Sequence, residues 1–260
     1  MDKLRNKKGY ICDMDGVIYH GNQILPGVKE FVNWLYKNDK QFLFLTNSSQ
    51  KTPEQLSKKL QIMGLKVGAE HFYTSALATA EFLSTQSPGC SAFVLGDNGI
   101  TNALYEKGIE FNDVDPDYVV IGETNNYNFE NICKATKLVQ NGARLIATNS
   151  DLTCPVENGF VPACKALVAP IELATLKKAY FVGKPNPLMT RVAMERFHKY
   201  NIHTKDVAMI GDRMDTDIII GIESGLDPIL VLSGCTKKED VQEYPYRPRL
   251  ILNGVGDIVD

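Results

Sequence analysis

The sequence lacks the patterns that mark several common classes of protein. No apolar run approaches the ~20 residues that a membrane-spanning helix needs. The basic residues near the N-terminus are not followed by an apolar segment of signal-peptide length. The six cysteines include no Cys-x-x-Cys pair, and the four histidines include no pair spaced for zinc. We therefore expect an intracellular, cytoplasmic protein with reduced thiols and no membrane partner.

Clustered basic charge and the common nucleotide-binding motifs are also missing. The net charge is -3, and Lys and Arg are spread along the chain, so no nucleic-acid partner is expected. No Gly-x-Gly-x-x-Gly follows an apolar run, and neither Gly-x-x-x-x-Gly-Lys-Ser/Thr nor Gly-x-Ser-x-Gly occurs. These absences exclude the dinucleotide-binding, P-loop and nucleophile-elbow classes of enzyme.

What the chain does contain is a repeated order of short apolar run, polar or glycine residues, and helical segment. Such runs occur at residues 10–12, 42–45, 180–182, 207–210 and 229–232. They are typical of strands buried on both faces of a parallel sheet. Apolar residues at helical spacing predict helices at residues 28–37, 53–64 and 188–200, the second with Thr52 as N-cap. The alternation predicts an α/β fold with a mainly parallel sheet.

The middle of the chain repeats this order by itself. Strands are predicted at residues 92–95, 118–121 and 145–147, with helices at residues 98–107 and 129–141 between them. Clusters of polar residues that could form a functional site lie before and after this middle segment. We therefore predict a smaller α/β domain at residues 78–178, inserted into a core made of residues 1–77 and 179–260.

Polar residues follow four of the predicted core strands. They are Asp13 and Asp15, then Thr46 and Asn47, then Lys184, then Asp212, Asp215 and Asp217. In open α/β sheets, ligands bind at the carboxyl ends of the strands. We therefore expect all four clusters to face one crevice.

The acidic clusters suggest a cation. Asp13 and Asp15 lie two apart on an extended chain, so their carboxylates point the same way and repel unless a positive charge lies beside them. Mg²⁺ favours one or two carboxylates together with water and a substrate phosphate. An Asp-Gly turn at Gly16 explains the pair about equally well. Asp212 is a candidate ligand for the same ion, whereas Asp215 and Asp217 could instead favour the N-terminus of the next helix.

The remaining polar residues suit a phosphate group. Lys184 lies between glycine and proline, in a rigid loop that could aim its ammonium group, although a single lysine is usually a surface residue. Thr46 and Asn47 offer a hydroxyl, an amide and backbone N–H groups. The neighbouring serines could equally start a turn before Thr52.

Together these segments resemble the motifs of the haloacid dehalogenase superfamily, in order. The matching segments are Asp13-Met14-Asp15-Gly16-Val17, Thr46-Asn47, Gly183-Lys184-Pro185 and Gly211-Asp212 with Asp217. Further segments resemble the NagD-like phosphatases: residues 15–20, 73–76, 146–149 and 231–234. The resemblance implies a Rossmann-like core with a large α/β cap inserted between the second and third motifs.

The resemblance also implies an activity, a magnesium-dependent phosphomonoesterase acting on small phosphorylated metabolites such as nucleoside monophosphates or sugar phosphates. Asp13 would attack the phosphate and form an aspartyl-phosphate, and Asp15 would protonate the leaving oxygen. Mg²⁺ would be held by Asp13, Asp15 (through its carbonyl), Asp212 and, less directly, Asp217. The phosphate and substrate would contact Thr46, Asn47, Lys184, Arg213, Asp215 and Thr216.

Other activities fit the same segments. A phosphotransferase or mutase would transfer the phosphoryl group to a sugar. A non-catalytic binding protein would be expected to lack at least one motif residue, whereas this chain contains all of them. The cap should select the substrate, with the loop at residues 148–151 and the stretch 160–167, including Lys165, as candidates. Either a monomer or a homodimer is compatible with the sequence.

Overall fold

The computed structural model of the chain describes residues 1–156 and 159–259, which form two compact units. The core unit consists of Met1–Thr46, Leu56–Tyr73 and Pro187–Asp260, and the cap unit of Asn47–Gln55 and Thr74–Asn186. The predicted domain limits, 1–77 with 179–260 and 78–178, stay a prediction. Residues 157, 158 and 260 of those ranges lie outside the described residues.

The core unit is built on a six-stranded sheet in the order β15-β14-β13-β1-β4-β5. Its strands are β1 (Gly9–Cys12), β4 (Gln41–Thr46), β5 (Phe72–Thr74), β13 (Val207–Gly211), β14 (Asp227–Val231) and β15 (Leu250–Leu252). The central strand β1 runs parallel to both β13 and β4, and all of its residues are buried. The predicted α/β fold with a mainly parallel sheet is therefore confirmed.

Helices cover this sheet. The core unit contains α1 (Asp2–Arg5), α2 (Val28–Lys37), most of α3 (Pro53–Ile62), α8 (Leu188–His198) and α9 (Ile219–Glu223). The predicted bounds of α2 are confirmed, because its apolar residues lie on one face and pack against strand residues such as Tyr10. Helix α3 begins with a capping box, in which Gln55 N–H donates to Thr52 Oγ1 at 3.3 Å and Thr52 N–H donates to Gln55 Oε1 at 2.9 Å.

Short elements connect the strands and helices of the core unit. A hairpin of β2 (Tyr19–His20) and β3 (Gln23–Ile24) follows β1. Short 3₁₀ turns lie at Ala69–His71, Thr204–Asp206, Asp240–Glu243 and Val255–Ile258.

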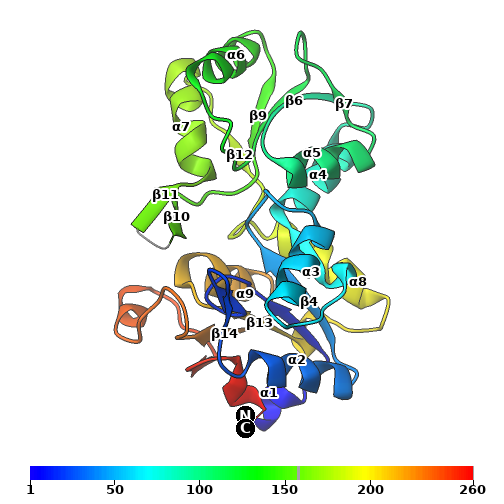
Figure 1. The fold of residues 1–260 in the computed structure, drawn as a ribbon, viewed down its shortest axis with the longest axis vertical. Helices are drawn as coiled ribbons and strands as arrows, with labels where there is room; N and C mark the ends of the chain where they lie inside the picture. Colours follow the sequence, from blue (N-terminus) through cyan, green and yellow to red (C-terminus); the bar gives the residue numbers. More distant parts are fainter. Residues whose placement is uncertain (157–158, 260) are drawn as a thin grey trace. The chain divides into compact units, whose positions relative to one another are not determined.

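The cap unit has its own five-stranded sheet in the order β12-β9-β8-β6-β7. The strands are β6 (Ser91–Leu95), β7 (Glu110–Phe111), β8 (Tyr118–Ile121), β9 (Arg144–Ala147) and β12 (Tyr180–Phe181). Helices α6 (Phe129–Gln140) and α7 (Cys164–Thr175) lie on one side of it, and α4 (Ser75–Gln86) and α5 (Asn98–Glu106) on the other (Figure 1). An antiparallel hairpin, β10 (Thr153–Val156) with β11 (Gly159–Pro162), precedes α7.

The strand that leads to Lys184 corrects the sequence prediction. Strand β12 pairs with β9 through Tyr180↔Ile146 and Phe181↔Ala147, so it belongs to the cap sheet. The expectation that all four polar clusters follow strands of one sheet is therefore wrong for Lys184. A short apolar run looks the same in either sheet, and its pairing partner decides where it lies.

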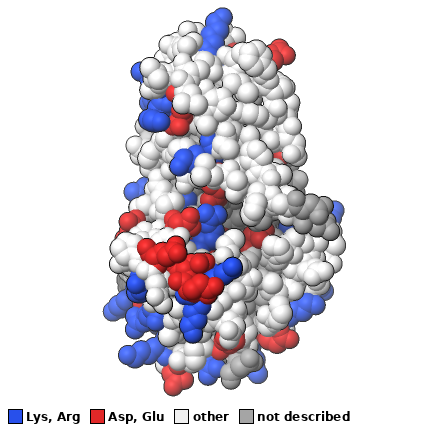
Figure 2. Space-filling view, turned by 90° about the vertical axis from the view of Figure 1, so that its left-hand side faces the viewer, with Lys and Arg blue, Asp and Glu red and all other residues white. Residues whose placement is uncertain are grey.

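The surface carries mixed charge. On the face drawn in Figure 2, Lys and Arg side chains are scattered among acidic and uncharged ones, and several acidic side chains form a group. Among the described residues, no helix has the length and apolar character required to cross a membrane.

Candidate active site

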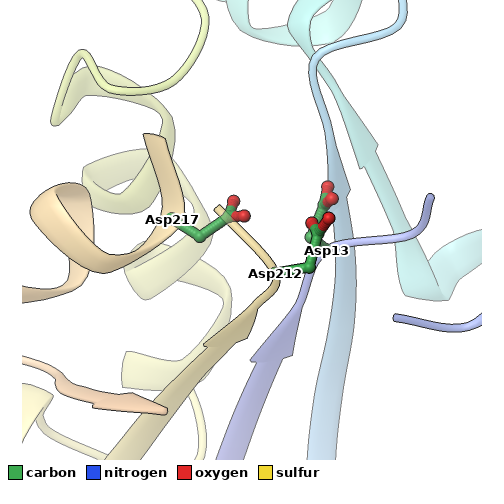
Figure 3. Close-up of side chains that lie close together, drawn as sticks. All are labelled: Asp13, Asp212 and Asp217. Carbon is green, nitrogen blue, oxygen red and sulfur yellow. The ribbon is translucent and has the colours of Figure 1, made fainter. Parts of the chain in front are cut away.

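Three buried carboxylates converge in the core unit. Asp13 directly follows β1, Asp212 directly follows the adjacent strand β13, and Asp217 lies in the π-helical turn Met214–Ile218. One carboxylate oxygen of each lies within 4.8 Å of the others. Figure 3 shows Asp217 pointing across from its turn toward the two strand ends. The parallel pairing of β1 with β13 brings the first two together, because Cys12 and Ile210 are register partners.

The surrounding backbone orients two of these acids. Asp212 Oδ2 accepts a hydrogen bond from Cys235 N–H at 2.7 Å. Asp217 Oδ2 accepts one from Arg213 N–H at 3.1 Å. Asp13, Asp212 and Asp217 are at most 8% exposed, so a cluster of like charges is held away from bulk water. Such a donor set of carboxylate oxygens fits a hard divalent cation such as Mg²⁺.

Asp15 has a different environment from Asp13. Its side chain is 52% exposed, and His20 Nδ1 lies 3.7 Å from its Oδ1. Partial burial raises the pKa of Asp15 above its usual value, while the nearby side chains of His20 and Lys59 oppose this effect. A carboxyl group with a raised pKa near solvent is suited to moving a proton.

Gly16 makes the turn after these acids possible. Its φ is +78°, a conformation that glycine adopts without strain, and a Cβ at this position would lie 2.6 Å from Asp212 Oδ2. Gly16 N–H donates to Tyr19 O at 2.8 Å, and Gly16 O accepts from Ser233 Oγ at 2.7 Å. The Asp-Gly turn considered as an alternative is thus present, together with the acidic cluster.

Arg213 and Asp215 pair with each other. Arg213 Nε and Nη2 donate to the two oxygens of Asp215 at 3.1 and 2.9 Å. Their side chains are 34% and 51% exposed, so the pair lies near solvent. Thr216 between Asp215 and Asp217 is buried. Of the predicted helix-terminal acids, Asp217 therefore points into the carboxylate cluster and Asp215 does not.

The predicted phosphate-binding residues divide between the two units. Thr46 is the buried last residue of β4, next to β1 in the core unit. Asn47 and Lys184 belong to the cap unit and are tied together. Asn47 Oδ1 accepts from Lys184 N–H at 2.7 Å, and Asn47 Nδ2 donates to Lys184 O at 3.1 Å and to Asp151 Oδ2 at 2.9 Å. The side-chain amide of Asn47 is thus used to hold the Lys184 loop.

A polar network that was not predicted from the sequence supports this loop. Glu123 follows β8 and accepts hydrogen bonds from Ser49 and Asn149. Burial raises the pKa of the Glu123 carboxyl above its usual value. Glu123 follows β8 after one glycine, as Lys184 follows the apolar run at residues 180–182, so looking for polar residues after the predicted cap strands as well would have identified it.

The predicted substrate-selecting residues have mixed settings. In the loop at residues 148–151, Thr148 and Asn149 are fully buried and take part in that network. Lys165 is exposed at the start of α7, where its N–H donates to Asp151 O at 3.0 Å. Phe160 on β11 is 74% exposed. Lys165, Phe160 and Val161 are therefore among the exposed members of the predicted set.

Comparisons with known proteins agree on one family. The family model described as haloacid dehalogenase-like hydrolase matches residues 10–110, and the one described as HAD-hydrolase-like matches residues 181–258. The chain is 42% identical over 251 residues to the dihydroxyacetone phosphatase of Corynebacterium glutamicum (strain R), covering 96% of this chain and 90% of that one.

Two further relatives are similar over most of their length. Identity to the ribonucleotide monophosphatase NagD of Escherichia coli (strain K12) is 40% over 251 residues, covering 96% of this chain and 98% of that one. Identity to the acid sugar phosphatase of Staphylococcus aureus (strain MRSA252) is 40% over 246 residues, covering 94% of each. The solved structure of NagD from E. coli K-12 matches with a TM-score of 0.90 and 39% identity, covering 98% of this chain and 100% of that one.

Proposed function

The chain belongs to the haloacid dehalogenase superfamily and, within it, to the NagD-like phosphatases. From this membership we propose that it hydrolyses small phosphomonoesters with Mg²⁺ and forms an aspartyl-phosphate intermediate. The observation that carries the proposal is the buried cluster of Asp13 and Asp212, at the ends of adjacent strands, with Asp217 from the turn that follows. Membership of the NagD-like phosphatases indicates phosphatase activity, whereas the metal ion and the mechanism are part of the proposal.

Asp13, Asp212 and Asp217 would hold the cation, with the Asp15 carbonyl as a further ligand. Bound Mg²⁺ would offset the negative charge of the acids and of the substrate phosphate. Asp217 is kept in place by Arg213 N–H, and Asp212 by Cys235 N–H. Asp13 remains the carboxylate assigned to attack the phosphorus atom, which breaks the ester bond and leaves a phosphorylated Asp13.

Proton transfer is assigned to Asp15. In the first step its carboxyl group gives a proton to the leaving alcohol oxygen, and in the second it takes a proton from the water that attacks the phosphorylated Asp13. The environment of Asp15 supports this division of roles, because its pKa is raised by burial and its carboxyl is half exposed. Asp13, in contrast, lies in the buried cluster.

The transferring phosphoryl group would be held by Thr46 and Lys184. Asn47 contributes by positioning the Lys184 loop, since both hydrogens of its amide already have acceptors within the cap unit. An ammonium group and a hydroxyl group stabilise the negative charge of the phosphoryl oxygens. Arg213, Asp215 and Thr216 are assigned to the edge of the substrate site.

The substrate class is a small phosphorylated metabolite. The relatives are named for dihydroxyacetone, ribonucleotide and acid sugar substrates, so sugar phosphates and nucleoside monophosphates are the first compounds to test. We propose a cytoplasmic enzyme that acts as a monomer or homodimer.

One experiment tests the activity and the mechanism. Phosphate release from p-nitrophenyl phosphate is measured with Mg²⁺, with EDTA, and for Asp13→Asn. We expect hydrolysis with Mg²⁺ and loss of about 10³-fold or more in the other two conditions. Activity that survives chelation or Asp13→Asn would overturn the mechanism. Sugar added as acceptor separates hydrolysis from transfer, because a transferase would form a new sugar phosphate in place of inorganic phosphate.

A further inference from the structure

A carboxylate of the cap unit, outside the proposed catalytic and binding set, is bound closely to the loop after β4. Glu123 Oε2 accepts hydrogen bonds from Ser49 N–H at 2.8 Å and from Ser49 Oγ at 3.2 Å. Ser49 Oγ in turn accepts from Glu123 N–H and from Thr148 Oγ1, both at 3.1 Å. Ser49 is fully buried, and a Cβ at Gly122 would lie 2.9 Å from its hydroxyl. The position of Ser49 is therefore closely determined by Glu123.

The other oxygen of Glu123 orients a buried asparagine. Asn149 Nδ2 donates to Glu123 Oε1 at 2.9 Å and to Asn47 O at 2.8 Å. Asn149 Oδ1 accepts from Asp151 N–H at 3.1 Å. Both hydrogens of this amide thus have acceptors, and Glu123 fixes which way the amide faces. An amide turned the other way would place its oxygen against Asn47 O, which is also an acceptor.

The network ends on the loop that carries Lys184. Asn149 holds the backbone of Asn47, and the Asn47 side chain makes two hydrogen bonds to the backbone of Lys184. A chain of hydrogen bonds therefore runs from Glu123 through Asn149 and Asn47 to Lys184, within the cap unit. All bonds in the chain are between 2.7 and 3.1 Å long.

We propose that Glu123 is a positioning residue for the phosphatase reaction, which holds the Asn47 loop and, through it, Lys184 in the place that phosphate binding requires. The inference rests on the proposed function of Lys184. It follows from the geometry, because a carboxylate is the side chain that can accept all three hydrogen bonds at once. Glutamine has one acceptor oxygen and would present an NH₂ group to Ser49 or to Asn149, both of which donate.

The test compares Glu123→Gln with a matched substitution, Glu110→Gln, on the exposed strand β7 of the same unit. Hydrolysis of p-nitrophenyl phosphate, the inhibition constant of inorganic phosphate and the midpoint of thermal unfolding are measured for each. For Glu123→Gln we expect kcat/KM to fall about 10- to 100-fold and the phosphate inhibition constant to rise, since small displacements in a site have effects of that size. Glu110→Gln should match the wild type.

Combining the change with Lys184→Ala separates positioning from a general structural role. If Glu123 acts through Lys184, Glu123→Gln should lower the residual activity of Lys184→Ala by less than about twofold. The proposal would be overturned if the reductions in kcat/KM caused by the two substitutions multiply fully in the double variant. It would also be overturned if kcat/KM of Glu123→Gln stays within twofold of the wild type. A wild type without magnesium-dependent hydrolysis would instead refute the proposed function.

A second variant covers the case in which Glu123→Gln is unfolded at the assay temperature. Ser49→Ala removes one hydroxyl from the network and leaves the backbone bond to Glu123 in place. Ser49→Ala should then raise the inhibition constant of phosphate about threefold or more in the wild-type background. In the Lys184→Ala background the same substitution should raise this constant by a smaller factor. An unchanged constant in a folded Ser49→Ala protein would contradict the proposal.

Discussion

The side chain of Asn47 binds the backbone of Lys184 on both sides, accepting from its N–H at 2.7 Å and donating to its carbonyl at 3.1 Å. This pair of bonds mimics the pairing of two strands and joins loops 137 residues apart in sequence. It explains why two residues that precede and follow the predicted inserted domain work as one element. The position of Lys184 therefore depends on a neutral amide as much as on its own loop.

Asn47→Ala should consequently weaken phosphate binding without removing a charge. The variant leaves the buried N–H and carbonyl of Lys184 without these partners, at a cost of about 1–3 kcal/mol in stability. We expect a higher inhibition constant for inorganic phosphate and a lower kcat/KM. Enzyme kinetics and chemical denaturation measure the two effects. Asn102→Ala on α5, which removes one exposed hydrogen bond, is the control. It should change the kinetic constants by less than about twofold and the free energy of unfolding by less than about 0.5 kcal/mol.

The carboxylate cluster predicts a stabilising effect of Mg²⁺ that depends on Asp13. Ligand binding to the folded state at about 100 times the dissociation constant adds about 2.7 kcal/mol to the free energy of unfolding. We expect Mg²⁺ to raise the unfolding midpoint of the wild type measured against EDTA, and to raise that of Asp13→Asn much less.

Asp15→Asn is the matched control for that measurement. Asp15 is assigned a backbone carbonyl as metal ligand, so changing its side chain should preserve the shift caused by Mg²⁺ while turnover falls. Equal shifts in Asp13→Asn and the wild type would show that Asp13 does not bind the ion.

Asp217 and Asp215 lie two residues apart and should respond differently to the same substitution. Asp217 is fully buried in the carboxylate cluster, whereas Asp215 pairs with Arg213 near solvent. Asp217→Asn should raise the Mg²⁺ concentration for half-maximal activity by about 10- to 100-fold, as is typical when a group that supports a metal site is lost. Asp215→Asn should leave it within about twofold. Magnesium titrations of the initial rate measure both, and a reversed order would contradict the assignment.

The predictable part of the fold depends on local pattern. Helix α2 has the predicted bounds because four of its apolar residues recur at helical spacing and all are buried. Strand β1 was predictable because it is apolar and directly precedes Asp13. Strand β12 has the same appearance, but only its pairing with β9 shows that it belongs to the cap sheet. Pairing between segments far apart in sequence leaves no local signal.

The candidate site divides in the same way. Asp13 and Asp212 could be identified because each ends a buried strand, and parallel strands bring their carboxyl ends together. The role of Asn47 in holding Lys184 could not be predicted from the sequence, because it depends on the direction in which one side-chain amide points. Glu123 contacts Ser49, 74 residues away, and no spacing within its own segment indicates that contact.

The close packing around Gly183 predicts that the Lys184 loop tolerates no added side chain there. A Cβ at this position would lie 2.7 Å from Asn47 Oδ1, Asn149 Cβ and Thr148 O. Gly183→Ala should therefore force the loops apart and lower the free energy of unfolding by about 1–3 kcal/mol, with weaker phosphate binding. Gly254→Ala is the control, since nothing lies within 4 Å of a Cβ there and its φ of -167° suits any residue. Equal stability of the two variants would show that the loop can adjust.

The buried Glu123 predicts a dependence of stability on pH. Burial raises the pKa of Glu123 in the folded protein above its ordinary value of 4.5, so the folded state binds the proton more tightly than the unfolded state. Its contribution to stability is therefore fully present below pH 4.5 and is lost as the pH rises through the folded pKa.

Chemical denaturation of the wild type and Glu123→Gln across this range isolates that contribution, because glutamine does not titrate and the other groups cancel. The stability of the wild type relative to Glu123→Gln should fall with rising pH, by about 1.4 kcal/mol for each unit by which the pKa is raised, and then level off. Glu110→Gln, changed at an exposed position, should show no such trend relative to the wild type. A difference between wild type and Glu123→Gln that rises with pH would mean that the hydrogen bonds from Ser49 and Asn149 stabilise the carboxylate more than burial disfavours it.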